Sequence, residues 1–204
     1  MYSKKWLTFY DQYVLYGVMP LVFGCPVGHV QGLYNAGVGA RHLELGVGTG
    51  YLPANAAFPV PDPEITLVDL NPAPLAYTAE RLARYKTIQV QANVLDPLPV
   101  EGPFDSAGLS FLLHCVPGSI WEKGVVLENA AKVVKPGGVI FGSTVLSSGV
   151  RVLPHARMYM KALNKRGIFH NERDSLDDLR RVLAGLGCYK LVVRGCVALF
   201  RARI

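Results

Sequence analysis

Three glycines at alternate positions, Gly46, Gly48 and Gly50, constrain this chain more than any other feature. They follow an apolar run that contains Glu44, and a helix can begin soon after them. Glycine is needed where the backbone turns with a positive φ or lies against a ligand with no room for a Cβ. Backbone N–H groups at such a strand-to-helix turn suit a polar or anionic end of a ligand. The stretch therefore predicts a ligand-binding turn at the end of a β-strand.

The spacing of these glycines distinguishes between two kinds of ligand. A dinucleotide fingerprint requires G-x-G-x-x-G, whereas this stretch reads G-x-G-x-G, with Tyr51 where the third glycine of that fingerprint would fall. Glu44 places a carboxylate at the strand's end, where it would oppose a pyrophosphate and suit a cationic group. A ligand with an ammonium and a sulfonium but no phosphate fits better, so NAD-dependent reduction is disfavoured. A glycine-rich turn with a purely structural role is the alternative.

Composition narrows the class of protein. Half of the 204 residues are hydrophobic and 18% are charged, which suits one folded domain. The net charge of +6 favours acidic partners, but the basic residues are scattered, so no nucleic-acid-binding patch is predicted. Prolines and glycines break the charge-free stretch 12–40 well short of the roughly 20 residues of a membrane span.

The N-terminal residues and the cysteines indicate the cellular compartment. No secretory apolar core follows the first five residues, so a cytoplasmic protein is expected. The cysteines have neither C-x-x-C nor cysteine–histidine ligand spacing, which predicts reduced thiols with no metal site. They are Cys25, Cys115, Cys188 and Cys196.

Strands and helices alternate from Arg41 onward, which is typical of a parallel sheet. The last two strands must be antiparallel, because only a Gly-Cys turn separates them. Strands are predicted at 41–45, 65–69, 88–92, 104–111, 139–145, 189–195 and 197–202. Helices are predicted at 6–17, 31–36, 49–57, 72–86 (capped by Asn71), from the Ser119/Glu122 capping box to Lys135, and at 174–186.

The stretch from Glu44 to Gly50 resembles motif I, E/D-x-G-x-G-x-G, of the class I S-adenosylmethionine-dependent methyltransferases. The later order of a strand ending in Asp69, a strand followed by Asn93, a Lys-Pro-Gly-Gly turn and a terminal hairpin is similar to that family from about residue 41 to 204. The resemblance implies an α/β, Rossmann-like methyltransferase fold. Its sheet would have seven mostly parallel strands with an antiparallel terminal hairpin, and helices on both faces. Residues 41–204 would form the S-adenosylmethionine-binding domain, with an N-terminal helical lid segment at 1–40 and a cap insertion at about 147–171.

The same resemblance assigns the cofactor contacts. Asp69, 19 positions after Gly50, ends a strand where a carboxylate can accept both ribose hydroxyls. The Asn93 side chain would reach the adenine amino group and the Val94 N–H a ring nitrogen, with Asp96 as the alternative reader. The expected cofactor-binding residues are Glu44, Gly46, Val47, Gly48, Gly50, Asp69, Leu70, Asn93, Val94 and Ser110.

His114 is the main candidate for acid–base chemistry. It follows the apolar fourth strand, which in this family ends beside the transferable methyl group, and histidine can take up a proton near neutral pH. Burial would lower its pKa and keep the ring neutral, as a base must be. Tyr10 and Tyr13, in an aromatic N-terminal segment, are further catalytic candidates. A packed structural histidine is the alternative.

Together these features imply an S-adenosylmethionine-dependent methyltransferase that acts on a small organic metabolite. The fourth strand lacks the Asn/Asp-Pro-Pro-Tyr/Phe motif, which counts against methylation of adenine N6 or glutamine. The aromatic N-terminal segment and the cap insertion could enclose the methyl acceptor, without nucleic acid or membrane as a partner. A methyltransferase acting on RNA or protein, and a methyltransferase fold repurposed for cyclisation or binding, stay open as alternatives. The oligomeric state and the acceptor's identity also stay open.

Overall fold

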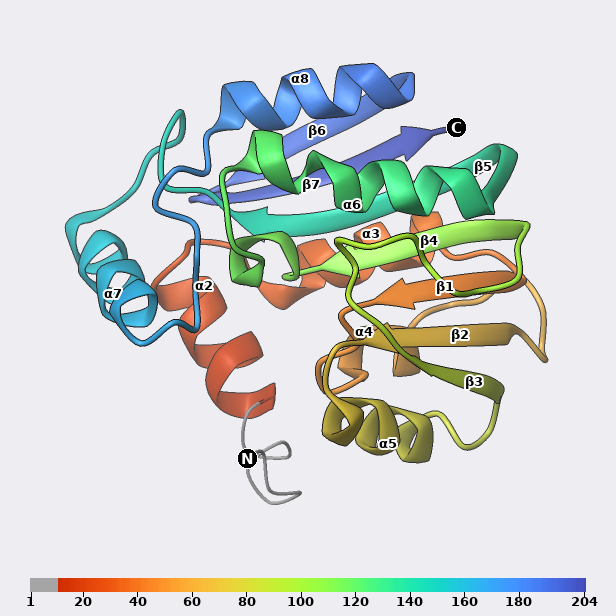
Figure 1. Cartoon of the computed structure of the whole chain (residues 1–204). Helices are drawn as coiled ribbons and strands as arrows, with labels where there is room; N and C mark the ends of the chain where they lie inside the picture. The colour runs from red at the N-terminus through yellow and green to blue at the C-terminus, as the bar shows by residue number, and fades with distance from the viewer. Residues whose placement is uncertain (1–10) are drawn as a thin grey trace.

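A seven-stranded sheet with the order β3-β2-β1-β4-β5-β7-β6 forms the centre of the computed structural model, which describes residues 11–204 (Figure 1). Strands β1 to β5 are parallel, and β7 runs antiparallel between β5 and β6. The predicted fold is confirmed. The strands are β1 Arg41–Leu45, β2 Glu64–Asp69, β3 Lys86–Gln91, β4 Phe104–Ser110, β5 Val134–Val145, β6 Cys188–Arg194 and β7 Val197–Arg203.

Helices cover both faces of this sheet. Helices α3 (Val27–Gly37), α4 (Tyr51–Ala54) and α5 (Pro72–Arg81) pack on one face, and α6 (Ile120–Val133) and α8 (Leu176–Leu186) on the other. Leucines recur at helical spacing in α8, and those at 176, 179 and 183 are buried, which fixes this helix to the sheet. The predicted capping box of α6 is confirmed, because the Ser119 and Glu122 side chains each accept a hydrogen bond from the other residue's backbone N–H.

The remaining helical segments lie beyond the carboxyl end of the sheet. The chain enters as a π-helix, η1 (Asp11–Val18), and continues as α2 (Met19–Leu21). We call residues 11–21 the strap. In Figure 1 the strap and α7 (Pro154–Lys165) lie at the end toward which the arrows of β1, β4 and β5 point. The short 3₁₀ turn η2 (Leu113–Cys115) follows β4 at the same end.

Several predicted boundaries are wrong. Helix α3 begins four residues earlier than expected, α4 is only one turn long, and α5 ends at Arg81 because the chain turns there to let β3 pair with β2 from Lys86. The Lys-Pro-Gly-Gly turn is a bulge inside β5, where the register shifts between Phe104 and Ser106 of β4. The part of the first predicted helix before Asp11 lies outside the described residues.

Helix α7 is an element that the sequence analysis missed. Its buried Ala156 and Met160 are four residues apart, a helical spacing that the sequence displays. The helix occupies the predicted cap insertion. No helix in residues 11–204 is long and apolar enough to cross a lipid bilayer.

Candidate functional site

The glycine turn between β1 and α4 has the geometry that motif I predicts. Gly46, Gly48 and Gly50 have φ values of 71°, 53° and 68°, in the region that glycine alone adopts easily. A Cβ on Gly46 would lie 2.7 Å from Leu112 Cδ1, and one on Gly50 would lie 2.6 Å from Thr78 Cγ2. A Cβ on Gly48 would meet nothing within 4 Å. Two of the glycines therefore allow close packing, and Gly48 borders open space where a ligand can approach the backbone.

Gly48→Ala and Gly50→Ala form a matched pair, because both introduce a Cβ at a similar positive φ. We expect Gly48→Ala to weaken S-adenosylhomocysteine binding about 30-fold, since the methyl group would enter the ligand's space at a cost of roughly 2 kcal/mol. Gly50→Ala should mainly lower the melting temperature, because its methyl group would collide with Thr78. Calorimetry and thermal unfolding would separate the two effects. Normal binding by Gly48→Ala would contradict the ligand-facing role.

Asp69 ends β2 beside this turn. Its Oδ2 accepts a hydrogen bond from the Val47 N–H at 3.1 Å, and its Oδ1 accepts one from the Asn71 N–H at 2.9 Å. Burial raises the pKa of this carboxyl, and the backbone hydrogen bonds oppose that rise. A carboxylate offers about four acceptor positions, more than these backbone N–H groups use, so acceptance of ribose hydroxyls stays a prediction. The neighbouring Leu70 side chain is exposed, as an edge of such a pocket would be.

The predicted adenine contacts follow β3. The Asn93 Oδ1 accepts the Leu95 N–H at 3.1 Å, so its own turn already uses the oxygen that was expected to read adenine. Val94 is buried, and its carbonyl accepts a hydrogen bond from the Asn129 side chain. Asp96, the alternative reader, is exposed. The assignment of Asn93 and Val94 to adenine stays a prediction.

Glu44 does not present a free carboxylate at the strand's end, as the sequence analysis expected. The side chain is buried on the α3 face, where Tyr34 donates to its Oε1 at 2.5 Å and His42 Nε2 lies 3.0 Å from its Oε2. Ser110 has a buried hydroxyl on the same face, and this hydroxyl interacts with that of Tyr34. Glu44 therefore supports the turn from within the core, and the contact of Ser110 with the cofactor stays a prediction.

His114 lies in η2, at the end of β4. The side chain is 3% exposed, and its Nδ1 accepts a hydrogen bond from the Val145 N–H at 3.2 Å. Burial, and then the positive charge of Lys123, lower the pKa of His114 to about 3. The ring is therefore neutral, as predicted, but its one basic lone pair is already used. This geometry argues against the predicted general-base role.

The strap is fastened to the glycine turn by polar contacts that the sequence analysis missed. The buried Asp11 accepts a hydrogen bond from Thr49 Oγ1 at 2.5 Å and lies 2.7 Å from an Arg81 nitrogen. Arg81 also donates to the Thr49 carbonyl at 2.8 Å. The Tyr16 and Tyr51 hydroxyls share a short hydrogen bond. The segment before α3 thus lies directly over motif I.

The strap also contacts the cap. Burial and a hydrogen bond with Tyr13 raise the pKa of Tyr159, in α7, to about 12. Tyr13, a predicted catalytic residue, therefore pairs with the cap, while Tyr10 lies outside the described residues. Ring contacts then continue inward, from Tyr159 to Phe23 at 5.9 Å, from Phe23 to Phe169 at 6.1 Å, and from Phe169 to His114 at 4.3 Å. An aromatic row joins the strap, the cap and the end of β4.

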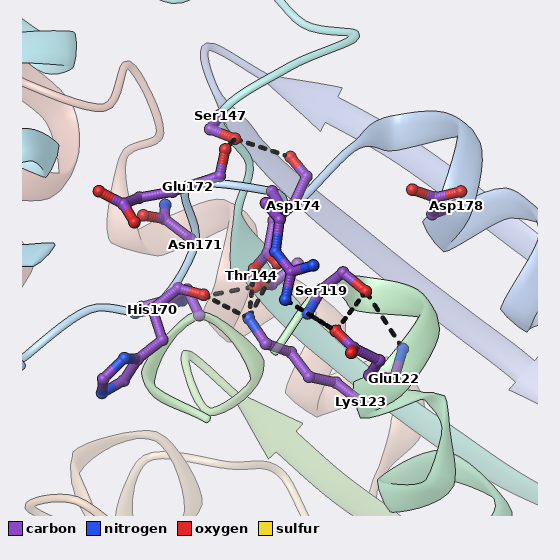
Figure 2. Close-up of polar contacts among 12 residues, drawn as sticks. Ser119, Glu122, Lys123, Thr144, Ser147, His170, Asn171, Glu172, Asp174 and Asp178 are labelled. Carbon is purple, nitrogen blue, oxygen red and sulfur yellow. Dashed lines mark hydrogen bonds and ion pairs between the residues drawn. The ribbon is translucent and has the colours of Figure 1, made fainter. Parts of the chain in front are cut away.

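A buried ion pair anchors the end of the cap. Figure 2 shows Lys123 reaching from α6 toward His170 and Asp174. Its Nζ lies 2.8 and 2.9 Å from the two Asp174 carboxylate oxygens and donates to the His170 carbonyl at 2.8 Å. Both charged side chains are fully buried. The Asp174 carbonyl accepts hydrogen bonds from Ser147 and Ser148, so both ends of the insertion meet here.

These observations define a class of protein: a Rossmann-like fold with a candidate nucleotide-cofactor site at the carboxyl ends of β1 and β2, next to the strap and α7. The open space at Gly48 and the Asp69 carboxylate beside it fit S-adenosylmethionine.

Comparison with known proteins gives the same class. Residues 43–140 match the model of the family described as "Methyltransferase domain". Demethylluteothin O-methyltransferase of Streptomyces thioluteus is 56% identical, over 98% of this chain and 88% of that protein. The physcion biosynthesis cluster O-methyltransferase of Aspergillus chevalieri is 35% identical, over 99% of this chain and 92% of that protein.

A solved structure shows the same fold. The N-methyltransferase NodS from Bradyrhizobium japonicum WM9, in complex with S-adenosylhomocysteine, superposes with a TM-score of 0.60 at 14% identity, over 86% of this chain and 84% of that one. The chain belongs to the class I S-adenosylmethionine-dependent methyltransferases. It is an enzyme, and its cofactor is S-adenosylmethionine.

Proposed function

We propose that this enzyme methylates a hydroxyl group of a small, flat organic metabolite. The observation that carries the proposal is the aromatic row from Tyr159 through Phe23 and Phe169 to His114, because it lies between the cap and the end of β4. Aromatic rings favour a flat, apolar acceptor. The names of the two O-methyltransferases above support oxygen as the attacking atom.

We assign cofactor binding and acceptor binding to two different regions of the chain. The turn around Gly48, with Asp69 and Ser110, would hold the cofactor, which supplies an electrophilic methyl group on a sulfonium when bound. The strap and the cap would exclude water and hold the acceptor oxygen in line with that methyl group. Positioning of this kind can supply roughly 7–11 kcal/mol of the barrier without any covalent intermediate.

The direct test is transfer of a labelled methyl group. The purified protein would be incubated with methyl-labelled S-adenosylmethionine and fractions of small metabolites, nucleic acid and protein. Label in a methyl ether of a small molecule would support the proposal. Label in RNA or protein would instead support the alternative substrates. Cofactor binding without transfer to any fraction would indicate a repurposed fold.

The strap gives a prediction of its own. Asp11→Ala should remove both the Thr49 hydrogen bond and the Arg81 ion pair, and so free the strap from motif I. We expect kcat/KM for the acceptor to fall about tenfold or more, the usual effect of losing a charge-assisted hydrogen bond. S-adenosylhomocysteine affinity should change less. Asp177→Ala, which breaks an exposed ion pair with Arg180, is the matched control and should leave both quantities unchanged.

An equal loss of cofactor affinity in Asp11→Ala would contradict the role of the strap as a lid and make it part of the cofactor pocket. Point variants are preferable to deletion of the strap, because Val18 and Met19 belong to the hydrophobic core. The cytoplasmic location and the absence of a nucleic-acid partner stay predictions of the sequence.

A further inference from the structure

The His114 ring lies where the cofactor turn, the end of β4 and the cap meet. Leu112, two residues earlier, packs against Gly46 of motif I, and a Cβ on that glycine would collide with it. On the other side, the ring centroid of Phe169 lies 4.3 Å from the imidazole, and that of Phe111 lies 6.0 Å away. Phe111 has a φ of 59°, which is unusual for a bulky residue and typical of functional sites.

The hydrogen bonds of this ring determine its tautomer. Nδ1 accepts the Val145 N–H at 3.2 Å, and the Thr144 hydroxyl lies 3.5 Å from the same nitrogen. A neutral imidazole with an acceptor at Nδ1 carries its proton on Nε2. Among residues 11–204, no hydrogen-bond partner faces Nε2. The nearby Lys123 ammonium, itself fully buried, opposes a second proton on the ring. His114 is therefore a fixed hydrogen-bond donor.

We propose that His114 donates its Nε2–H to the acceptor oxygen, and that the acceptor is an acidic enol or phenol, which reaches the site already ionised. This inference rests on the proposed function and names the substrate class. The hydroxyl proton leaves to solvent before transfer. A lone pair of the oxyanion then forms the new O–CH₃ bond, and the S–CH₃ electron pair stays on sulfur, which becomes a neutral thioether. A donor aimed at an oxyanion makes a charge-assisted hydrogen bond, which is stronger than a neutral one.

Two variants of His114 separate a donor from a base and from a structural cap. Glutamine can place an N–H near the position of Nε2, whereas asparagine can place an acceptor near Nδ1 for the Val145 N–H but has no donor at Nε2. A donor role predicts that His114→Gln keeps most of the function and His114→Asn loses it. A base role predicts that both lose it, and a purely structural role predicts that His114→Asn is the better variant.

The probe is 4-nitrophenol, whose phenolate has a distinct visible absorption band, added to protein saturated with S-adenosylhomocysteine at a pH below the probe's own pKa. The wild type and His114→Gln should bind it as the phenolate. His114→Asn should bind the phenolate about 10- to 100-fold more weakly, the range for one charge-assisted hydrogen bond. Equal S-adenosylhomocysteine affinity in all three proteins, by calorimetry, would show that the variants are folded. Nitrogen NMR of the labelled wild type should find Nδ1 unprotonated and Nε2 protonated.

Equal phenolate binding by His114→Asn, equally weak binding by both variants, binding of the neutral phenol only, or no binding at millimolar probe would each overturn the proposal. A proton found on Nδ1 would also overturn it. These failures differ from a failure of the proposed function. In that case the labelled methyl group would not reach any small hydroxylated metabolite, whatever the form of bound 4-nitrophenol.

Discussion

Replacing Asp69 with alanine is expected to weaken S-adenosylhomocysteine binding about 30- to 1000-fold, because two hydrogen bonds to one half-buried carboxylate are worth roughly 2–4 kcal/mol. In the structure the carboxylate accepts the Val47 N–H and so holds the motif I turn. The family resemblance assigns it a second task, to accept the ribose hydroxyls. Isothermal titration calorimetry would measure the loss directly.

Asp69→Asn is the matched control. The amide keeps one oxygen that can accept the Val47 N–H, but it has no negative charge and only one acceptor atom. We expect an affinity between those of the wild type and the alanine variant. If Asp69→Ala bound S-adenosylhomocysteine as tightly as the wild type, the assignment of the ribose to the end of β2 would be wrong.

Replacing Lys123 with methionine is expected to lower the free energy of unfolding by about 3–5 kcal/mol, because removal of one partner leaves the other charge buried without compensation. Asp174 is fully buried, and Lys123 contacts both of its carboxylate oxygens (Figure 2). Urea unfolding at neutral pH would measure this change. Lys123→Met combined with Asp174→Leu should recover much of the stability, since it removes both charges. Arg180→Met, at an exposed pair with Asp177, should cost less than about 1 kcal/mol.

The pH dependence of this effect has a definite sign. Burial raises the pKa of Asp174 to about 6, against the ordinary value of about 3.9 in an unfolded chain. The folded state therefore holds a proton that the unfolded state has lost, and the stability from this group falls as the pH rises from about 4 through 6. Loss of the Lys123 charge should raise that pKa further. The destabilisation by Lys123→Met should thus be larger at pH 8 than at pH 5, and an equal loss at both would contradict this role of the pair.

The Lys123–Asp174 ion pair also holds the end of the cap next to His114. Lys123 holds the His170 carbonyl, and the His170 N–H in turn donates to the His114 carbonyl at 2.7 Å. The end of the cap and the η2 turn are therefore tied to α6 through one side chain.

Features that depend on neighbouring residues could be predicted from the amino-acid sequence. Alternating glycines, a carboxylate at a strand's end and a Ser-x-x-Glu box each act over a few neighbouring residues, so their geometry can be predicted from the residues alone. The motif I turn, the position of Asp69 at the end of β2, the α6 cap and the antiparallel hairpin were predicted in this way, and the structure has them. The order of strands and helices then implied the sheet and the family.

The hydrogen bonds and ion pairs of the site side chains could not be predicted, because their partners lie far away in the chain. Asp11 meets Thr49 and Arg81 across 38 and 70 positions, and Lys123 meets Asp174 across 51. No local pattern encodes such pairs. The same reason explains two contacts at the site that the sequence did not predict. Glu44 faces Tyr34 and His42 in the core, and Val145, 31 positions after His114, uses the lone pair that a base would need. The Val145 N–H, on the neighbouring strand, fixes the tautomer of His114, and for that reason the role that we propose for this ring is that of a donor.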